Sequence, residues 1–411
     1  RREAHGPHHQ GYRRPDGGVQ LFRPWDNMER LKNSCIRMGL PVVPPEDALE
    51  AVKALVKVDE RFVPSEPGTS LYIRPFLFGT DAKLGLHGVH EAMFIVVLSP
   101  VGSYFDNGME PVKIIVETED VRAVRGGTGE AKCGGNYGAS NRAGERAFAN
   151  GYSQVLWLDG VEHKYVEEGG GMNVVFKIGG KIVTPMLTGS ILPGITRRSC
   201  LQLLRDWGTP AEERLITVDE LFEAAENGTL EEAMCVGTAA VICPIGELTY
   251  GDKVYTINNF QTGPLAQKLY DTLTGIQWGT AEDPRLDLPP VRAAVARTDC
   301  PNPQNPGIFS HKVEQVRQKK GRPVENGLTT VRTRATVTPT YKTDTKGGTQ
   351  DDDHADEPCD DGGCQSRRFP LLRCLQRAYR RHDGRHCRGV HFCCHYYDYQ
   401  PDYHYQHYWH K

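Results

Sequence analysis

The chain has 411 residues, of which 38% are hydrophobic and 25% charged, and its formal net charge is -3. This length allows two or three domains with a cleft between them, and the balanced charge gives no reason to expect nucleic acid or a membrane surface as a partner. The longest apolar run, at 92–98, is too short to span a bilayer and suits a buried strand. Because no apolar stretch typical of a secretory signal stands at the start, we expect a cytoplasmic protein.

Helix and strand patterns alternate along the chain from about residue 19 to residue 280. In the first part, Met28, Leu31, Cys35 and Met38 recur at helical spacing, and Gly39 follows them as a typical helix end. Apolar and β-branched runs further along are typical of strands. The predicted elements are helices over 26–38 and 47–56 and strands over 71–78 and 92–98.

A polar, glycine-rich passage at 125–138 interrupts this pattern, and we expect a loop there. Beyond it, Thr217 and Glu220 have the spacing of a helix capping box. The predicted elements are strands over 154–158, 172–178 and 181–185, a helix over 194–207, strands over 239–243 and 253–257 that pair across 250–252, and a last helix over 264–276. Strands that cluster between helices, with few regular βαβ repeats, favour an α+β architecture in two lobes.

Residues 285–411 differ in composition from the rest of the chain. They combine an acidic run, a basic stretch and a His-, Tyr- and Cys-rich end without an apolar face to bury, so we expect a disordered tail. The ligand-type residues at this end follow no regular spacing of pairs, and no metal site is expected. The cysteines before residue 285 are scattered singly, which argues against a disulfide framework.

The segment GGTGEAKCGGNYGAS, at 126–140, is the most distinctive motif of the chain. It matches neither a phosphate loop nor a dinucleotide-binding fingerprint, because it has no GKS or GKT ending and no helical pattern after its first glycines. One lysine, Lys132, stands between two glycine-rich turns, and glycines allow the close backbone approach that a lysine bound to a cofactor aldehyde needs. From the residues alone, an exposed loop lysine and a nucleotide-binding loop both stay open.

KCGGNYGAS resembles the KxGGNYG segment of branched-chain aminotransferases, the fold-type-IV group of pyridoxal-phosphate enzymes. The resemblance implies pyridoxal 5′-phosphate as cofactor and a two-domain fold-type-IV architecture with the active site in the interdomain cleft. We expect a small N-terminal domain over 1–119, an interdomain linker over 120–131 and a larger cofactor-binding domain over 132–284. Other segments resemble the family in the same order and spacing: LFRPWDNMERL at 21–31, SLYIRP at 70–75, LSPVGSYF at 98–105, QVLWLDG at 154–160, EGGGMN at 168–173, ILPGITRR at 191–198 and VGTAAVICP at 236–244.

The start of the chain departs from the family. Family members carry another strand-rich stretch before LFRPW, with a YG-x-x-x-FEGLKAYR-like motif that walls the substrate pocket. Here HGPHHQGYRRPDGG stands in that place, and only YRRPDGG resembles the family. We therefore expect a small domain that is truncated or altered at its start.

The resemblance assigns Lys132 as the lysine that binds the cofactor and moves the substrate proton. Glu168 corresponds to the carboxylate that pairs with the pyridine nitrogen, and Tyr137 to the phenol that faces the ring oxygen. Arginines suit a dianionic phosphate, and the amides at the start of a helix can bind one. The remaining cofactor-binding residues implied by the family are Arg23 and Arg122 on the phosphate, Ile195 and Thr196 at the start of a helix, Thr238 with its hydroxyl group, and Leu192 packed on the ring.

A substrate site follows from the same resemblance. Thr238 and Ala239 correspond to the turn whose amides receive the α-carboxylate. Tyr72 and Arg74 correspond to a Tyr-x-Arg strand that the partner subunit supplies in this family. These four residues are expected to form the substrate site.

The apolar side-chain pocket is expected to involve Tyr104, Leu84 and Leu86. Leu84 and Leu86 alternate on an expected strand, so a place in the core is nearly as good an interpretation. Two features depart from the family. Gly171 stands where the usual EVGTMN motif has threonine, and the redox CxxC of some mammalian members has no counterpart at 240–243.

The resemblance implies a homodimer with a ping-pong reaction, in which L-leucine, L-isoleucine or L-valine gives its amino group to 2-oxoglutarate. Its partners would be small-molecule amino acids and 2-oxo acids. Alternatives within the fold are a D-amino-acid aminotransferase and an aminodeoxychorismate lyase. Two from other classes are a non-catalytic relic that binds the cofactor, motivated by the altered start, and a nucleotide-binding protein that uses the glycine-rich loop.

Overall fold

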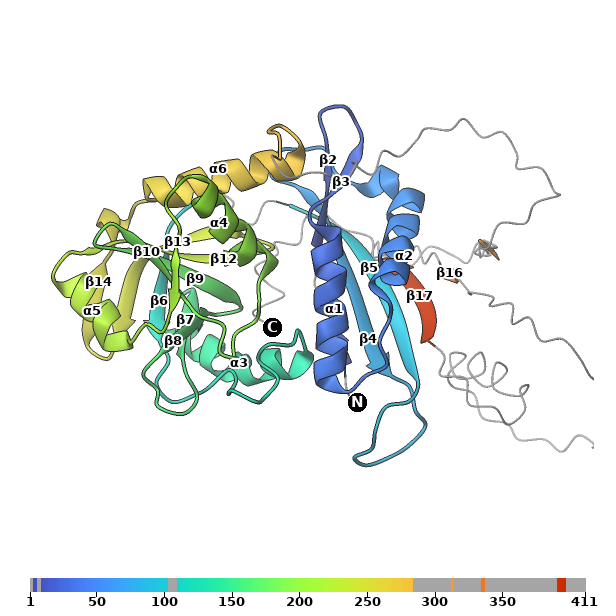
Figure 1. Ribbon diagram of the computed structural model, residues 1–411, viewed down its shortest axis with the longest axis horizontal. Coiled ribbons are helices and arrows are strands. Elements are labelled where there is room, and N and C mark those ends of the chain that lie inside the picture. The colour runs from blue at the N-terminus through green and yellow to red at the C-terminus, as the bar shows by residue number, and fades with distance from the viewer. Residues whose placement is uncertain are drawn as a thin grey trace, which may run out of the picture.

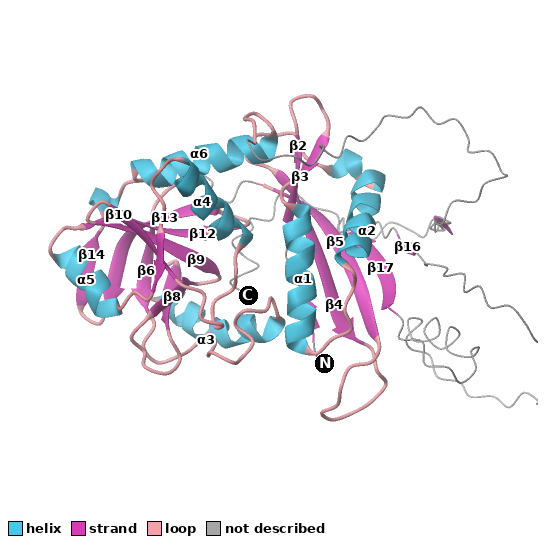
Figure 2. Ribbon diagram, in the orientation of Figure 1, coloured by secondary structure: helices cyan, strands magenta, loops and turns pink. Residues whose placement is uncertain are grey.

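The computed structural model of the chain describes residues 3–5, 9–102 and 109–283, together with the backbone of three short strands at 312–313, 334–336 and 390–396. Two lobes, each built on its own β-sheet, lie side by side (Figure 1). Helices pack on the sheets of both lobes (Figure 2), as the predicted two-lobe α+β architecture requires. None of the described helices is long and apolar enough to cross a membrane.

The sheet of the first lobe is centred on a long antiparallel pair of strands. This pair consists of β4 (Ser70–Gly79) and β5 (Ala92–Val101). β2 (His9–Arg13) pairs with β4 and with β3 (Val19–Leu21), and β1 (Glu3–His5) pairs with the other end of β4. The predicted strands at 71–78 and 92–98 are confirmed, each with slightly wider bounds.

Two helices, α1 (Pro24–Met38) and α2 (Pro45–Val58), lie on one face of this sheet (Figure 1). α1 ends as its sequence predicts, because Gly39 has a φ of 63°, the left-handed conformation that glycine adopts at a helix C-terminus. Met28 and Leu31 belong to the core that the helices share with the strands. This core fixes which face of α1 turns away from the sheet.

The sheet of the second lobe closes on itself. Its order is β11-β10-β9-β12-β13-β6-β7-β8, β8 also pairs with β9, and β14 pairs with β13. The strands from β9 round to β8 therefore form a barrel-like ring. Its strands are β6 (Val112–Val116), β7 (Gln154–Leu158), β8 (Val166–Gly169), β9 (Met172–Ile178), β10 (Lys181–Pro185), β11 (Glu212–Arg214), β12 (Leu230–Gly237), β13 (Val241–Tyr250) and β14 (Lys253–Thr256).

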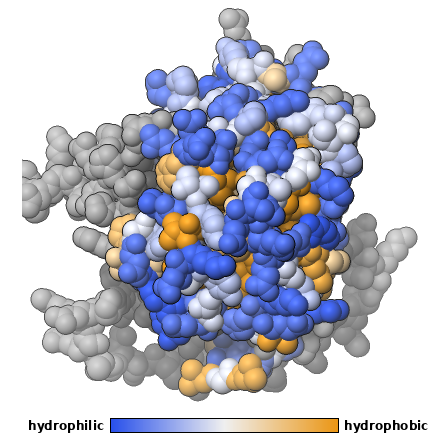
Figure 3. Space-filling model, turned by 90° about the vertical axis from the view of Figure 1, so that its left-hand side faces the viewer, coloured by the Kyte–Doolittle hydropathy of each residue, from blue (hydrophilic) through white to orange (hydrophobic). Residues whose placement is uncertain are grey.

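Helices pack around this ring, and its outer face carries mainly hydrophilic side chains (Figure 3). The N-cap half of the predicted capping box is confirmed, because Thr217 Oγ1 accepts a hydrogen bond of 3.0 Å from the backbone N–H of Glu220. The carboxylate of Glu220 pairs with Arg214 instead of returning to Thr217. The helices are α3 (Gly134–Ala149), α4 (Ile195–Asp206), α5 (Val218–Glu226) and α6 (Pro264–Trp278), with short 3-10 turns η1 (Glu60–Phe62) in the first lobe and η2 (Asn258–Phe260) in the second.

Helix α3 was not predicted, and it corrects the expected loop at 125–138. Its sequence has four glycines and no large apolar residue that recurs at helical spacing. The helix is stabilised instead by close packing, since Ala143 and Ala147 lie against Val155 and Trp157 of β7. Lys132 therefore stands just before a helix, not between two glycine-rich turns of a linker.

Two further expectations are corrected, one about a domain boundary and one about strand pairing. The sequence places the end of the first domain at residue 119. β6, which ends before that residue, is parallel to β13 and to β7 and therefore belongs to the sheet of the second lobe. The segment at 239–243 pairs with β12, and only the far end of β13 pairs with β14 across the predicted turn. A local pattern predicts a strand but not its partner, which depends on contacts distant in sequence.

The expectation for the tail falls largely outside the described residues. Within residues 285–411, only three strand backbones are described, and the sequence predicted none of them. β17 (Val390–Tyr396) runs parallel to β5, and β16 (Arg334–Thr336) and β15 (Lys312–Val313) follow it outward.

Candidate active site

Lys132 is held at the start of α3 by hydrogen bonds from both lobes. Its backbone N–H donates to Ser34 Oγ of α1 at 3.0 Å. The side chain of Asn136 closes the preceding turn, because its Nδ2 donates to the carbonyl oxygens of Thr128 at 2.9 Å and Ala131 at 2.8 Å. The lysine side chain is only 6% exposed, so the interpretation of an exposed loop lysine is wrong.

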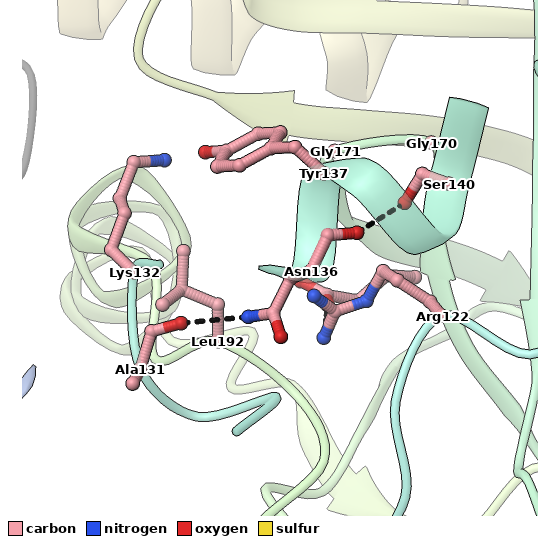
Figure 4. Close-up of a pocket in the computed structure, with 10 residues that line it drawn as sticks. Arg122, Ala131, Lys132, Asn136, Tyr137, Ser140, Gly170, Gly171 and Leu192 are labelled. Carbon is pink, nitrogen blue, oxygen red and sulfur yellow. Dashed lines mark hydrogen bonds and ion pairs between the residues drawn. The ribbon is translucent and has the colours of Figure 1, made fainter. Parts of the chain in front are cut away.

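The surroundings of Lys132 favour its neutral form. Burial and the positive charge of Arg30 lower the pKa of Lys132 well below its usual value, and the negative charge of Glu168 opposes them only in part. A neutral amine is the form that attacks an aldehyde. The amine also lies 5.5 Å from the centre of the Tyr137 ring and points toward its hydroxyl group (Figure 4).

A pocket opens in front of this lysine. The ends of the Lys132 and Tyr137 side chains face each other there, and Asn136, Arg122 and Ser140 lie to one side of them (Figure 4). The pocket is lined by Arg122, Ala131, Lys132, Asn136, Tyr137, Ser140, Glu168, Gly170, Gly171 and Leu192.

Glu168 lies on β8 directly opposite Asn173 of β9. Asn173 Nδ2 donates to Glu168 Oε1 at 3.0 Å, and Arg122 forms an ion pair with the other carboxylate oxygen. Burial raises the pKa of Glu168 to about 7, although Arg122 opposes this rise. Glu168 is thus a buried carboxylate that titrates near neutral pH, not a solvated loop residue.

The next residue in the strand, Glu167, faces a different set of groups. Its carboxylate accepts a hydrogen bond from Ser190 Oγ, and Ser190 in turn offers its carbonyl oxygen to Arg122 Nη2 at 2.5 Å. Arg122 therefore sits between the two glutamates. The structure places it at the carboxylate end of the pocket, whereas the family resemblance implies a place beside the phosphate.

A second pocket lies between the two lobes. It contains Ile195 and Thr196 at the start of α4, and Thr238 of the turn between β12 and β13. The first backbone amides of a helix and its dipole favour an anion at this point. The first lobe contributes His9, Gln10, Tyr12, Phe22 and Asn27, and Gln277 completes the lining.

Arg23 reaches the first turn of α4 from the first lobe. Its Nη1 donates to Ser199 Oγ at 2.8 Å, and its Nε donates to Asp26 at 2.6 Å. Ser199 Oγ donates to the carbonyl oxygen of Ile195. Ile195, Thr196 and Thr238 thus line one pocket, and Arg23 contacts the same helix through Ser199 without lining that pocket.

Tyr72 and Arg74 lie near Lys132 within one chain. Arg74 donates to the Tyr72 hydroxyl group at 2.5 Å, and its charge contributes to the low pKa of Lys132. A partner subunit is therefore not needed to bring this pair to the site, contrary to the expectation from the family. Ala239 follows Thr238 in the turn between β12 and β13.

The expected apolar pocket residues are not brought to the site of the same chain. Leu84 and Leu86 lie in the loop between β4 and β5, not on a strand, and their side chains are 102% and 92% exposed. They are therefore not core residues either. Tyr104 lies outside the described residues.

Sequence reasoning missed several residues of the site. Asn136, Asn173 and Ser190 orient Lys132, Glu168 and Glu167. Asn136 and Asn173 lie within the motifs KCGGNYGAS and EGGGMN, which could have marked them, whereas no motif includes Ser190. Arg30 could have been found from the sequence, because Asn27, Arg30 and Ser34 recur at helical spacing on α1. Polar side chains that are buried at such a spacing indicate a helix face that is turned to another lobe.

The residues present fit pyridoxal phosphate. Lys132 offers a neutral amine to the aldehyde, Glu168 a carboxylate to the pyridine nitrogen, and Leu192 an apolar surface to the ring. The start of α4 offers amides to the phosphate. A Cβ added at Gly171 would meet no atom within 4 Å, so the threonine that is absent there leaves open space at the pocket wall.

Comparisons with known proteins identify the relatives of this chain. The family model described as amino-transferase class IV matches residues 16–248. Branched-chain-amino-acid aminotransferase 2 of Bacillus subtilis (strain 168) is 54% identical over 268 residues, which cover 65% of this chain and 74% of that protein.

Two solved structures are similar in fold. The branched-chain amino acid aminotransferase of Escherichia coli has a TM-score of 0.59 and 25% identity, over 69% of this chain and 88% of that one. The branched-chain aminotransferase of the thermophilic archaeon Thermoproteus uzoniensis, solved with norvaline, has a TM-score of 0.57 and 29% identity, over 68% of this chain and 86% of that one.

Proposed function

The chain belongs to the class IV aminotransferase family, and we propose that it transfers the amino group of L-leucine, L-isoleucine and L-valine to 2-oxoglutarate with pyridoxal phosphate as cofactor. The products would be branched-chain 2-oxo acids and L-glutamate. The observation that carries this proposal is the buried amine of Lys132, which shares one pocket with Glu168 and Tyr137.

Each residue has a distinct part in the proposed reaction. Lys132 binds the cofactor aldehyde and later accepts the proton from the substrate Cα on its Nζ. Bound pyridoxal phosphate supplies an electron sink for the negative charge that develops at this carbon. Glu168 holds the proton on the pyridine nitrogen, and Arg122 and Asn173 orient its carboxylate.

The other residues bind and orient the ligands. Arg23 and the amides of Ile195 and Thr196 hold the phosphate, and the turn at Thr238 and Ala239 receives the substrate carboxylate. The D-amino-acid aminotransferase and the lyase of the same fold are not favoured by the named relatives. The glycine-rich loop as a nucleotide site is not favoured either, since Lys132 is turned into the pocket.

The decisive experiment measures amino transfer by the purified protein supplied with pyridoxal phosphate. We expect L-glutamate to form from L-leucine and 2-oxoglutarate, and the near-visible absorbance of the lysine-bound cofactor to vanish in Lys132→Ala. Lys164→Ala is the control, since Lys164 is a lysine of the same lobe outside the pocket. Cofactor binding without turnover would identify the relic, and turnover of D-alanine alone would identify the D-specific alternative.

We also propose that the protein is a homodimer in the cytoplasm. Leu84 and Leu86 are the most exposed large hydrophobic side chains among the described residues, and such side chains on a monomer would be open to water. A second copy of the chain would cover them. The five cysteines described, Cys35, Cys133, Cys200, Cys235 and Cys243, are all free and buried, which suits a reducing compartment.

A further inference from the structure

Helix α1 carries a buried polar face. Arg23, Asn27, Arg30 and Ser34 follow one another at intervals of three and four residues, which places them on one side of the helix. Asn27, Arg30 and Ser34 are all buried, whereas a helix packed on a sheet ordinarily buries apolar side chains. The adjoining side of α1 supplies Met28, Leu31 and Cys35 to the core of the first lobe.

This polar face of α1 is turned toward the second lobe and the candidate active site. Three of its members contact the second lobe: Arg23 through Ser199, Arg30 through the carbonyl oxygen of Pro193, and Ser34 through the backbone N–H of Lys132. The face therefore runs from the start of α4, where the phosphate is expected, to the lysine. Arg30 lies between these two ends.

The guanidinium of Arg30 is not neutralised by a carboxylate. Its hydrogen bonds reach only neutral oxygens, that of Pro193 at 3.4 Å and Asn27 Oδ1 at 3.3 Å, and its buried Nε has no hydrogen-bond partner. Asp26, the acidic residue whose charge acts on it, already pairs with Arg23 and Arg198. A buried charge without a carboxylate partner lowers the stability of the folded state, so we expect Arg30 to have a function that offsets this cost.

The charged groups around Lys132 show what that role is. Arg30 of α1 and Arg74 of β4 face it from the first lobe, and Arg122, Glu168 of β8 and Tyr137 of α3 face it from the second. Of the charges that act on this amine, that of Arg30 has the largest effect, and it disfavours a proton there. Arg122, which is paired with Glu168, acts less strongly.

Burial lowers the pKa of Arg30 to about 10, a value at which it still carries its charge at neutral pH. Lys132 and Arg30 thus lie in one buried site, and the cheaper way to relieve their repulsion is to leave the lysine uncharged. We propose that Arg30 is a positioning residue of the reaction, whose buried positive charge keeps Nζ of Lys132 unprotonated.

The proposal rests on the proposed function only in naming the cofactor aldehyde as the target of Lys132. An unprotonated Nζ forms the C=N bond with the aldehyde carbon, and the aldehyde oxygen leaves as water with the two amine protons. A protonated amine has no free electron pair for this step.

The test is the pH dependence of the reactivity of Lys132 in the cofactor-free chain. Competitive labelling with acetic anhydride over a range of pH, read by peptide mass spectrometry, gives the midpoint at which Lys132 loses its proton. We expect this midpoint to move to higher pH in Arg30→Met and Arg30→Gln, and to return toward that of the unchanged chain in Arg30→Lys, which restores the charge.

The matched control is Arg198→Gln, which removes another arginine near Asp26. The side chain of Arg198 is 62% exposed, so its charge is screened by water and the Lys132 midpoint should stay in place. Circular dichroism and thermal melting establish that each variant is folded. Methionine suits the buried position, because an apolar chain of similar length avoids an unsatisfied polar group.

Three outcomes would overturn the proposal. The first is an unchanged Lys132 midpoint in folded Arg30→Met and Arg30→Gln. The second is an equal shift of that midpoint in Arg198→Gln. The third is loss of the folded state in both Arg30→Met and Arg30→Gln, which would make Arg30 a structural residue. None of these readings depends on transamination. A chain that fails to turn over L-leucine but shows the expected shift would contradict the proposed function and leave this inference standing.

Discussion

Arg122 and Glu168 form an ion pair with both side chains almost fully buried, at 7% and 3% exposure. The arginine comes from the segment between β6 and α3 and the glutamate from β8, and both side chains are shielded from water. In such surroundings the attraction is stronger than at a surface, and it partly offsets the cost of burying the carboxylate. Arg122 thereby favours the charged form of Glu168 that the proposed reaction requires.

Glu168→Gln should separate cofactor binding from catalysis. The amide keeps the size of the side chain but removes the charge that favours a protonated pyridine nitrogen, while Arg23, Ile195, Thr196 and Thr238 remain to hold the phosphate. We expect the cofactor to bind and proton transfer from L-leucine to slow by about 10²–10³-fold, the usual effect of removing a preorganised charged or polar group. Single-turnover absorbance measurements with L-leucine give this rate.

The control for that variant is Glu167→Gln, the neighbouring buried glutamate that bonds to Ser190 instead of facing the pocket. Its effect on the rate should be much smaller. Equal rates for the two variants, or a larger loss at Glu167, would contradict the assignment of Glu168.

The stability of the cofactor-free chain should fall as pH rises through the range in which Glu168 titrates. Burial raises the pKa of Glu168 from 4.5 to about 7, so the folded state holds a proton that the unfolded state has released. Between these two pH values the free energy of unfolding should decrease by up to ~1.4 kcal/mol per pH unit from this group. Urea unfolding at a series of pH values measures the slope.

Glu168→Gln should flatten this pH dependence, because the variant has no proton to lose. Asp159→Asn is a suitable control. The pKa of Asp159 is lowered to about 2, chiefly by backbone N–H groups that outweigh its burial, so its contribution changes only in more acidic solution. A slope that survives in Glu168→Gln would assign it to other groups, among them Glu167, whose pKa burial also raises.

Two adjacent glycines at the pocket should respond differently to alanine. Gly170 has a φ of +55°, and a Cβ there would meet the side chain of Gln154, whereas a Cβ at Gly171 would meet nothing within 4 Å. Gly170→Ala should cost about 1–2 kcal/mol in the free energy of unfolding from backbone strain alone. Gly171→Ala should be close to neutral. Chemical denaturation of the two variants gives the comparison, and equal losses would mean that the turn is not strained.

The exposed loop between β4 and β5 should control the oligomeric state. Replacing Leu84 and Leu86 together by aspartate should shift the protein from dimer to monomer, because charged side chains oppose burial in an interface. Size-exclusion chromatography with light scattering measures the mass in solution. Val161→Asp is the matched control, since Val161 is also exposed, at 79%, but lies in the second lobe. A dimer that persists in the Leu84 and Leu86 variant would place the interface elsewhere.

The sequence by itself determined most of the local elements, and its resemblance to a family singled out a candidate for the cofactor lysine. β7, β9 and β10 have the predicted bounds, and α1 ends at Gly39, because strand alternation, helical periodicity and glycine caps depend on residues close together in the chain. Lys132, Glu168 and Tyr137 were assigned from a motif resemblance, and the structure brings them to one pocket.

Only the tertiary structure decided how deeply these residues are buried and which charged groups surround them. Burial and the charge of Arg30 lower the pKa of Lys132, and burial raises the pKa of Glu168 against the effect of Arg122. These contacts join segments that are far apart in sequence. Helix α3 depends on alanines that fit against Trp157, and the sheet that β6 joins depends on its neighbours β13 and β7. Electrostatic fields and close packing act through space, so local sequence patterns do not encode them.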